Sequence, residues 1–136
     1  MRDLMASLQY FDDFLIYLLL SFALLAAFAW LYDKVTPYDE MQLIRDGNTA
    51  AAIAYSGAIV GLALPLGSAI AHSVNPVDMV IWGVFGLGVQ VLVYFLVRRL
   101  LPGLNDQIPA DKPGPAILLA ALSIGAGIVN AACLTY

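Results

Sequence analysis

Few side chains in this sequence could do chemistry. The chain has 136 residues, with one histidine, His72, and one cysteine, Cys133. A single cysteine excludes an internal disulfide, and a single histidine excludes a multi-histidine metal site within one chain. The sequence also contains no Ser/His/Asp set, no Walker loop and no catalytic carboxylate pair that spacing alone would bring together. We therefore expect no enzyme, no metal site and no cofactor.

Four polar side chains remain as candidates, because they lie within or beside apolar segments. Gln90 and Asn130 are amides inside such segments, and Asp13 and Asp78 are carboxylates at the edges of such segments. An amide in lipid needs a hydrogen-bond partner, so Gln90 and Asn130 either line a pore or bond one helix to another. We favour the bond between helices. In an oligomer, Asp13 and Asp78 would form an outer acidic ring that concentrates cations.

The composition shows which kind of protein must position these residues. Apolar residues make up 62% of the chain and charged residues 12%, whereas a soluble domain carries roughly 25% charged residues. The mean hydropathy is +0.85. So few charges cannot cover the surface of a soluble fold. The net charge of −4 also leaves no basic surface for nucleic acid, so the expected partner is the lipid bilayer.

Four charge-free segments are each long enough to cross a membrane as a helix, which takes about 20 residues. They are Phe14–Tyr32, Thr49–Ala71, Met79–Val97 and Pro115–Tyr136. Strands of a membrane barrel would alternate apolar and polar residues, and these segments do not. The sequence therefore predicts an all-α membrane protein with four transmembrane helices, and residues 1–136 form a single membrane domain.

The Lys and Arg residues predict how the helices are oriented. Arg2 lies on the side that holds both termini, and the opposite side holds Lys34, Arg45, Arg98, Arg99 and Lys112. Cytoplasmic loops carry the excess of positive charge. We therefore expect the loops 33–48 and 98–114 in the cytoplasm and both termini outside.

The two halves of the chain align with a shift of 64 to 65 residues. The shared positions pair Asp13 with Asp78, Pro37 with Pro102, Gly57 with Ala121, and Gly61 with Gly125. Each half would hold two spans, so both copies would have the same orientation. The sequence predicts two parallel two-helix repeats, about 12–72 and about 77–136.

The first loop has the pattern of a short helix at the cytoplasmic interface, over Pro37–Asp46. Thr36 can cap it, Pro37 suits its first position, and Asp39 and Glu40 favour the positive end of its dipole. Gly47 can end it in a left-handed conformation, and Asn48 or Thr49 can cap the next span. Tyr38, Asp39 and Glu40 would offer a docking face to a cytoplasmic protein partner. The prolines of the second loop predict no helix there beyond one turn.

Small residues predict which spans meet. Gly57 and Gly61 form a GxxxG motif, and Ala121 and Gly125 occupy the equivalent places in the fourth span. Small residues allow helix backbones to approach in lipid, so we place the second and fourth spans at the centre and expect self-association. Pro65 should bend the second span, either as a static kink, which we favour, or as a hinge or cavity lining.

Several motifs resemble those of the YjfL-like inner-membrane proteins, whose domain is named domain of unknown function 350. These are Thr36-Pro37-Tyr38-Asp39-Glu40, Gly47-Asn48, Gly57-x-x-x-Gly61 and Leu64-Pro65-Leu66. The resemblance implies a bacterial inner-membrane protein with a duplicated two-helix unit. It also implies a link to envelope stress, since similar proteins are often encoded near a membrane-stress protein. It implies no activity.

Two functions fit the sequence. The first is an oligomeric structural or accessory membrane subunit, which the absence of charge inside the spans favours. The alternative is an oligomeric ion channel or small-solute transporter with Gln90 and Asn130 around its axis.

Overall fold

The computed structural model describes residues 2–134, and this part of the chain is all-helical. Four long helices are apolar enough to cross a membrane, which confirms the predicted spans. They are α1 (Arg2–Val35), α3 (Thr49–His72), α4 (Pro76–Leu100) and α6 (Pro113–Cys133), and the short helices are α2 (Glu40–Arg45) and α5 (Leu104–Gln107). The last two residues of the predicted fourth span, 135 and 136, lie outside the described residues.

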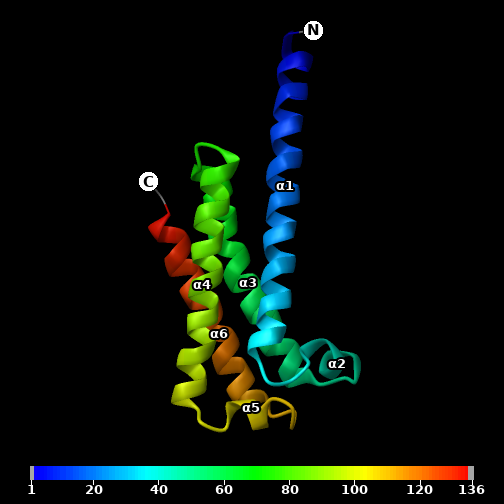
Figure 1. Ribbon diagram of the computed structural model, residues 1–136, viewed down its shortest axis with the longest axis vertical. Helices are drawn as coiled ribbons and strands as arrows, with labels where there is room; N and C mark the ends of the chain where they lie inside the picture. Colours follow the sequence, from blue (N-terminus) through cyan, green and yellow to red (C-terminus); the bar gives the residue numbers. More distant parts are fainter. Residues whose placement is uncertain (1, 135–136) are drawn as a thin grey trace.

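The loops that carry α2 and α5 lie at one end of the bundle, and the first turns of α1 and the last turns of α6 lie towards the other (Figure 1). The most extensive contact joins α3 and α6, and α4 packs against both of them. Helix α1 packs against α3 and α4 from Tyr17 onwards, and its first part extends beyond the other helices (Figure 1). The centre of the fold is therefore the α3–α6 pair.

Glycines allow α3 and α6 to meet backbone to backbone. A Cβ atom added to Gly57 would overlap Ala120, and one added to Gly61 would overlap the backbone oxygen of Ser123. A Cβ added to Gly127 would overlap the backbone of Gly61. Such close approach is what gives helix pairs their packing energy in lipid, where no hydrophobic effect pushes helices together.

The residues predicted for this contact on α6 are not the ones that make it. Ala121 and Gly125 are exposed, and a Cβ on Gly125 would meet nothing within 4 Å. The reason is rotational, because one residue turns an α-helix by about 100°. A shift of one or two positions therefore moves this pair of residues from the contact to the outer face.

The short helix after α1 is present, but it begins later than predicted. Helix α1 continues to Val35, and the Thr36 N–H donates to the Tyr32 carbonyl oxygen over 3.0 Å. Thr36 therefore closes α1, whereas Asp39 caps α2 by accepting a bond from the Gln42 N–H. The predicted ends elsewhere are confirmed, since Gly47 has φ +88° and Asn48 caps α3.

The two loops close with the same backbone hydrogen bonds. The N–H groups of Gly47 and Asn48 donate to the carbonyls of Ile44 and Leu43 over 3.0 and 2.8 Å. In the second loop, 64 positions further along, the equivalent bonds are Asp111 to Ile108 over 3.0 Å and Lys112 to Gln107 over 3.1 Å. Gly47 and Asp111 both have positive φ. Each short helix therefore ends in the same local geometry.

We expect Gly127→Ala to lower the free energy of unfolding by about 1–3 kcal/mol, because its Cβ would press on the Gly61 backbone. Gly125→Ala is the matched control, since its Cβ would meet open space. Equilibrium unfolding of both variants in mixed micelles measures the difference. Equal stability of the two variants would contradict the α3–α6 contact.

Candidate functional site

A carboxyl group is buried where α2 meets the bundle. Helix α2 packs its apolar residues Leu43 and Ile44 against α3, which turns its first residue, Glu40, inwards. Glu40 is only 1% exposed, and its Oε1 accepts a hydrogen bond from the Thr36 hydroxyl over 2.5 Å. The predicted docking role of Glu40 is therefore wrong, because a buried side chain cannot contact a partner protein. Asp39 is exposed.

Aromatic rings surround this carboxyl group. Tyr32 packs edge-on against Tyr55 and Tyr94, with ring centroids 6.0 and 5.6 Å away. The Tyr94 hydroxyl donates to Oδ1 of Asn105 over 2.6 Å. Glu40 interacts electrostatically with all three of these rings and with Tyr38. The carboxyl group thus lies in an aromatic, poorly hydrated environment.

Three buried oxygen atoms around Glu40 have no hydrogen-bond partner among the described residues. They are Oε2 of Glu40, Oδ1 of Asp33 and the hydroxyl of Tyr32. The pKa of Glu40 is raised to about 8, chiefly by burial; the Asp33 side chain adds to the rise, and the Thr36 hydrogen bond opposes it. Burial also raises the pKa of Tyr38. At neutral pH, Glu40 is therefore mostly protonated.

Two side chains join the first loop to the second. Asn48 caps α3 with its Oδ1, which accepts from the Ala51 N–H over 2.8 Å, and its Nδ2 donates to the carbonyls of Ile108 and Pro109 over 3.1 Å each. Oδ1 of Asp111 accepts from the Ala50 N–H over 2.9 Å. The sequence analysis missed Asp111, although its alignment with Gly47 and the tolerance of Asp for positive φ could have identified it.

Gln90 makes a hydrogen bond between helices. It is 1% exposed, and its Nε2 donates to the backbone oxygen of Ser123 over 3.1 Å. This bond joins α4 to α6 beside Gly61, where an added Cβ would lie 2.7 Å from Oε1 of Gln90. Within one chain, Gln90 therefore acts as the interhelical contact that the sequence analysis favoured.

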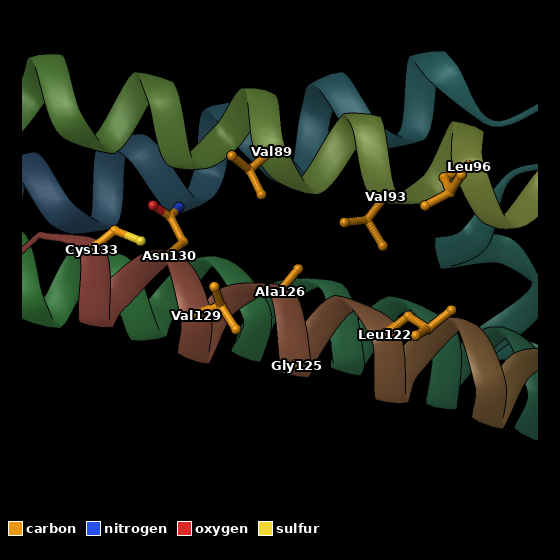
Figure 2. Close-up of a pocket in the computed structure, with 9 residues that line it drawn as sticks. All are labelled: Val89, Val93, Leu96, Leu122, Gly125, Ala126, Val129, Asn130 and Cys133. Carbon is orange, nitrogen blue, oxygen red and sulfur yellow. The ribbon is translucent and has the colours of Figure 1, made fainter.

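Asn130 lies instead in a groove between α4 and α6 (Figure 2). The groove has a volume of about 540 Å³ and is otherwise apolar. Its lining comes from α4 (Val89, Val93 and Leu96) and α6 (Leu122, Gly125, Ala126, Val129, Asn130 and Cys133). Nδ2 of Asn130 is buried and has no hydrogen-bond acceptor among residues 2–134. This amide has a donor left to satisfy.

The remaining predicted residues are spread over the molecule. At the end opposite the loops, the Asp78 carboxylate accepts from the Val74 N–H over 3.3 Å and from Nε1 of Trp82 over 3.1 Å. Asp78 therefore stabilises the start of α4, while Asp13 is exposed on α1. Pro37 is exposed before α2, and Pro65 is buried within α3, which continues through it.

We expect Asn48→Ala and Asp111→Ala each to lower the free energy of unfolding by about 1 kcal/mol, because each removes an acceptor from the first turn of α3. Thermal unfolding of the variants in detergent checks this. Thr49→Ala is the control, because the Thr49 side chain is exposed. Unchanged stability of Asp111→Ala would show that the second loop does not support α3.

The raised pKa of Glu40 predicts a pH-dependent stability. The folded chain holds a proton up to pH about 8, whereas the unfolded chain releases it near its ordinary pKa of about 4.3. The contribution of Glu40 to the free energy of unfolding is therefore fully present below pH about 4.3, the ordinary glutamate pKa. It is lost as the pH rises to about 8. The unfolding temperature should fall over this range in the native chain and stay flat in Glu40→Gln. A parallel fall in both would contradict the assignment to Glu40.

Comparison with known proteins identifies relatives of the whole chain. The family model described as Domain of Unknown Function (DUF350) matches residues 3–134. The chain is 36% identical to the UPF0719 inner membrane protein YjfL of Escherichia coli K12. The alignment spans 120 residues and covers 88% of this chain and 91% of that protein. It is also 29% identical to the UPF0719 transmembrane protein YshE of Bacillus subtilis strain 168. That alignment spans 110 residues and covers 79% of this chain and 82% of the relative.

No solved structure shows a significant match. The family match extends from the first residues of α1 to the end of α6, so it includes both loops and all four long helices. The four apolar helices agree with the membrane location given for the relatives. The chain belongs to the DUF350 family and is a multi-pass inner-membrane protein.

Proposed function

We propose that this protein is an oligomeric structural or accessory subunit of the inner membrane. The observation that carries the proposal is the buried amide of Asn130, which has an unused donor in the α4–α6 groove. An unpaired amide in a lipid-facing groove is costly. A helix from another subunit that filled the groove would offer an acceptor to this amide once the half-buried Asn130 side chain turned outwards.

The walls of the groove suit such a helix. Gly125 leaves open space beside it, and Ala121 is exposed on the same helix one turn away. Small residues of this kind let a second helix approach closely. The positions that the sequence analysis assigned to helix packing are thus free for contacts between copies of the chain.

The internal organisation belongs to the same proposal. Two parallel two-helix repeats, about 12–72 and about 77–136, would each consist of a long helix, a short helix and a long helix. The loop-closing bonds at Gly47 and Asp111, 64 positions apart, support this duplication. The excess of Lys and Arg in the two loops supports a cytoplasmic location for them and an outer location for both termini.

A cytoplasmic partner protein would then meet the end of the bundle that carries the loops. The exposed residues of the first loop include Pro37, Asp39 and Met41, and Tyr38 is half-buried behind them. A partner would therefore recognise a proline, one carboxylate and an apolar side chain, without Glu40. An envelope-stress role rests only on the family resemblance.

A channel or small-solute transporter is the second candidate function, and Asn130 again provides the favouring observation. Copies that turned their α4–α6 grooves towards a common axis would line it with this amide. Gln90 would not contribute, because its Nε2 is bonded to Ser123. Asp78 would contribute weakly to an outer ring, because its carboxylate already accepts bonds within α4.

Native mass spectrometry of the protein, extracted from its own membrane in nanodiscs, tests the proposal. We expect a defined oligomer or a complex with a stoichiometric partner protein, and Asn130→Leu should shift it towards monomers. Ser7→Ala is a control on exposed α1. A ring of four or more copies without other proteins would favour the channel, and liposome flux would then decide. A monomer without companions would contradict both functions.

Cys133 provides a second check, because it is the single cysteine and lies exposed in the groove beside Asn130 (Figure 2). We expect mild oxidation or a short bis-maleimide to give covalently linked dimers in membranes. Disulfides need Cα atoms within about 7 Å, so a positive result would place two α6 helices together. Cross-linking that is equally strong in Asn130→Leu would mean that this amide does not hold the contact.

A further inference from the structure

We propose that Glu40 and Asp33 form a binding site for one proton, enclosed beneath α2 at the end of the bundle that carries both loops. The site is defined by geometry. Glu40 is 1% exposed, Tyr32 is 1% exposed, and each directs an oxygen atom without a hydrogen-bond partner into this region. Oδ1 of Asp33 is the third such atom.

The second loop shows what packing alone requires at this position. Leu104 is the first residue of α5, as Glu40 is the first residue of α2, and the two are 64 positions apart. Leu104 is fully buried. An apolar side chain therefore fills this place in the fold without any desolvation cost, whereas a carboxyl group there is unfavourable unless it has a ligand or partner. Packing does not explain Glu40.

Protein groups do not neutralise the carboxyl group. No Lys, Arg or His contributes to the electrostatics of Glu40 within the described part of the chain. The nearby groups are Asp33 and Tyr32 on α1, Tyr38 in the loop, Tyr55 on α3 and Tyr94 on α4, with Arg98 interacting with Tyr94. A buried carboxyl group beside a half-buried second one and among phenols needs a cation from solution.

The proton is the cation that this site favours. Two carboxyl groups cannot both be ionised at close range in a poorly hydrated place, so one retains a proton, which the other can accept as a hydrogen bond. The Asp33 side chain interacts with Glu40 in the direction that favours the protonated form of Glu40. Among residues 2–134, no three Asp, Glu, His or Cys side chains come together, so a multivalent metal would find too few ligands.

Loss of the proton would act on the loop. An ionised Glu40 would require water or exposure, and the way to reach either is to move α2, whose contacts with the bundle are the few apolar ones to α3. Release of α2 would also break the hydrogen bond between Glu40 and Thr36, the residue that closes α1. The protonation state of one carboxyl group would thereby control the conformation of the first loop.

The chain offers an unusually direct test, because Glu40 is its single glutamate. Glutamate labelled with ¹³C at the carboxyl carbon therefore reports Glu40, apart from glutamine amide signals that do not titrate. In the full-length protein in nanodiscs, we expect a titration midpoint of about 8, against about 4.3 for an ordinary glutamate. A midpoint near the ordinary value would overturn the proposal.

Two variants and one exchange of salt test the components of the site. Asp33→Asn should lower the midpoint, because it removes the neighbouring carboxyl group. Asp39→Asn should leave it unchanged, since Asp39 is exposed and asparagine also caps a helix. An unchanged midpoint in Asp33→Asn would overturn the pairing. A midpoint that falls when Na⁺ or K⁺ replaces an organic cation at constant ionic strength would overturn the proton as the ligand.

Discussion

The close approach of two helix backbones at Gly61 and Gly127 is the contact on which the rest of this structure depends. It brings α3 and α6 together where side chains would keep them apart. Gln90 then attaches α4 by bonding the Ser123 oxygen next to the same contact. At the loop end, the α3–α6 pairing places Asp111 beside the first turn of α3. Among the four long helices, α1 depends least on this contact, because it packs mainly against α4 and α3.

Much of this fold could be predicted from the sequence, because lipid imposes simple rules. The four spans follow from charge-free length, and the end of α2 at Gly47 follows from the need for a left-handed residue. The importance of Gly57 and Gly61 also followed from their spacing. Composition and local backbone chemistry are sufficient for features of this kind, since they do not depend on how helices rotate against one another.

Features that depend on rotation and burial could not be predicted. Nothing local distinguishes Ala120 from Ala121, so the contact face of α6 required the three-dimensional packing. Glu40 matched the expectation for an exposed residue in a first helical turn, and its burial arises only because α2 folds back on α3. Sequence reasoning thus located the loop but misjudged which of its carboxyl groups faces water.

The length of α1 has a consequence for the membrane surface at the end of the bundle opposite the loops. Its 34 residues extend about 50 Å, whereas the hydrocarbon layer is about 30 Å thick. The segment before Phe14 therefore continues into water with neither lipid nor neighbouring helices of the bundle beside it. A dozen unsupported residues are at the margin of helix stability. This segment would exchange between helix and coil. Any molecule that binds the helical form would shift that equilibrium towards the helix.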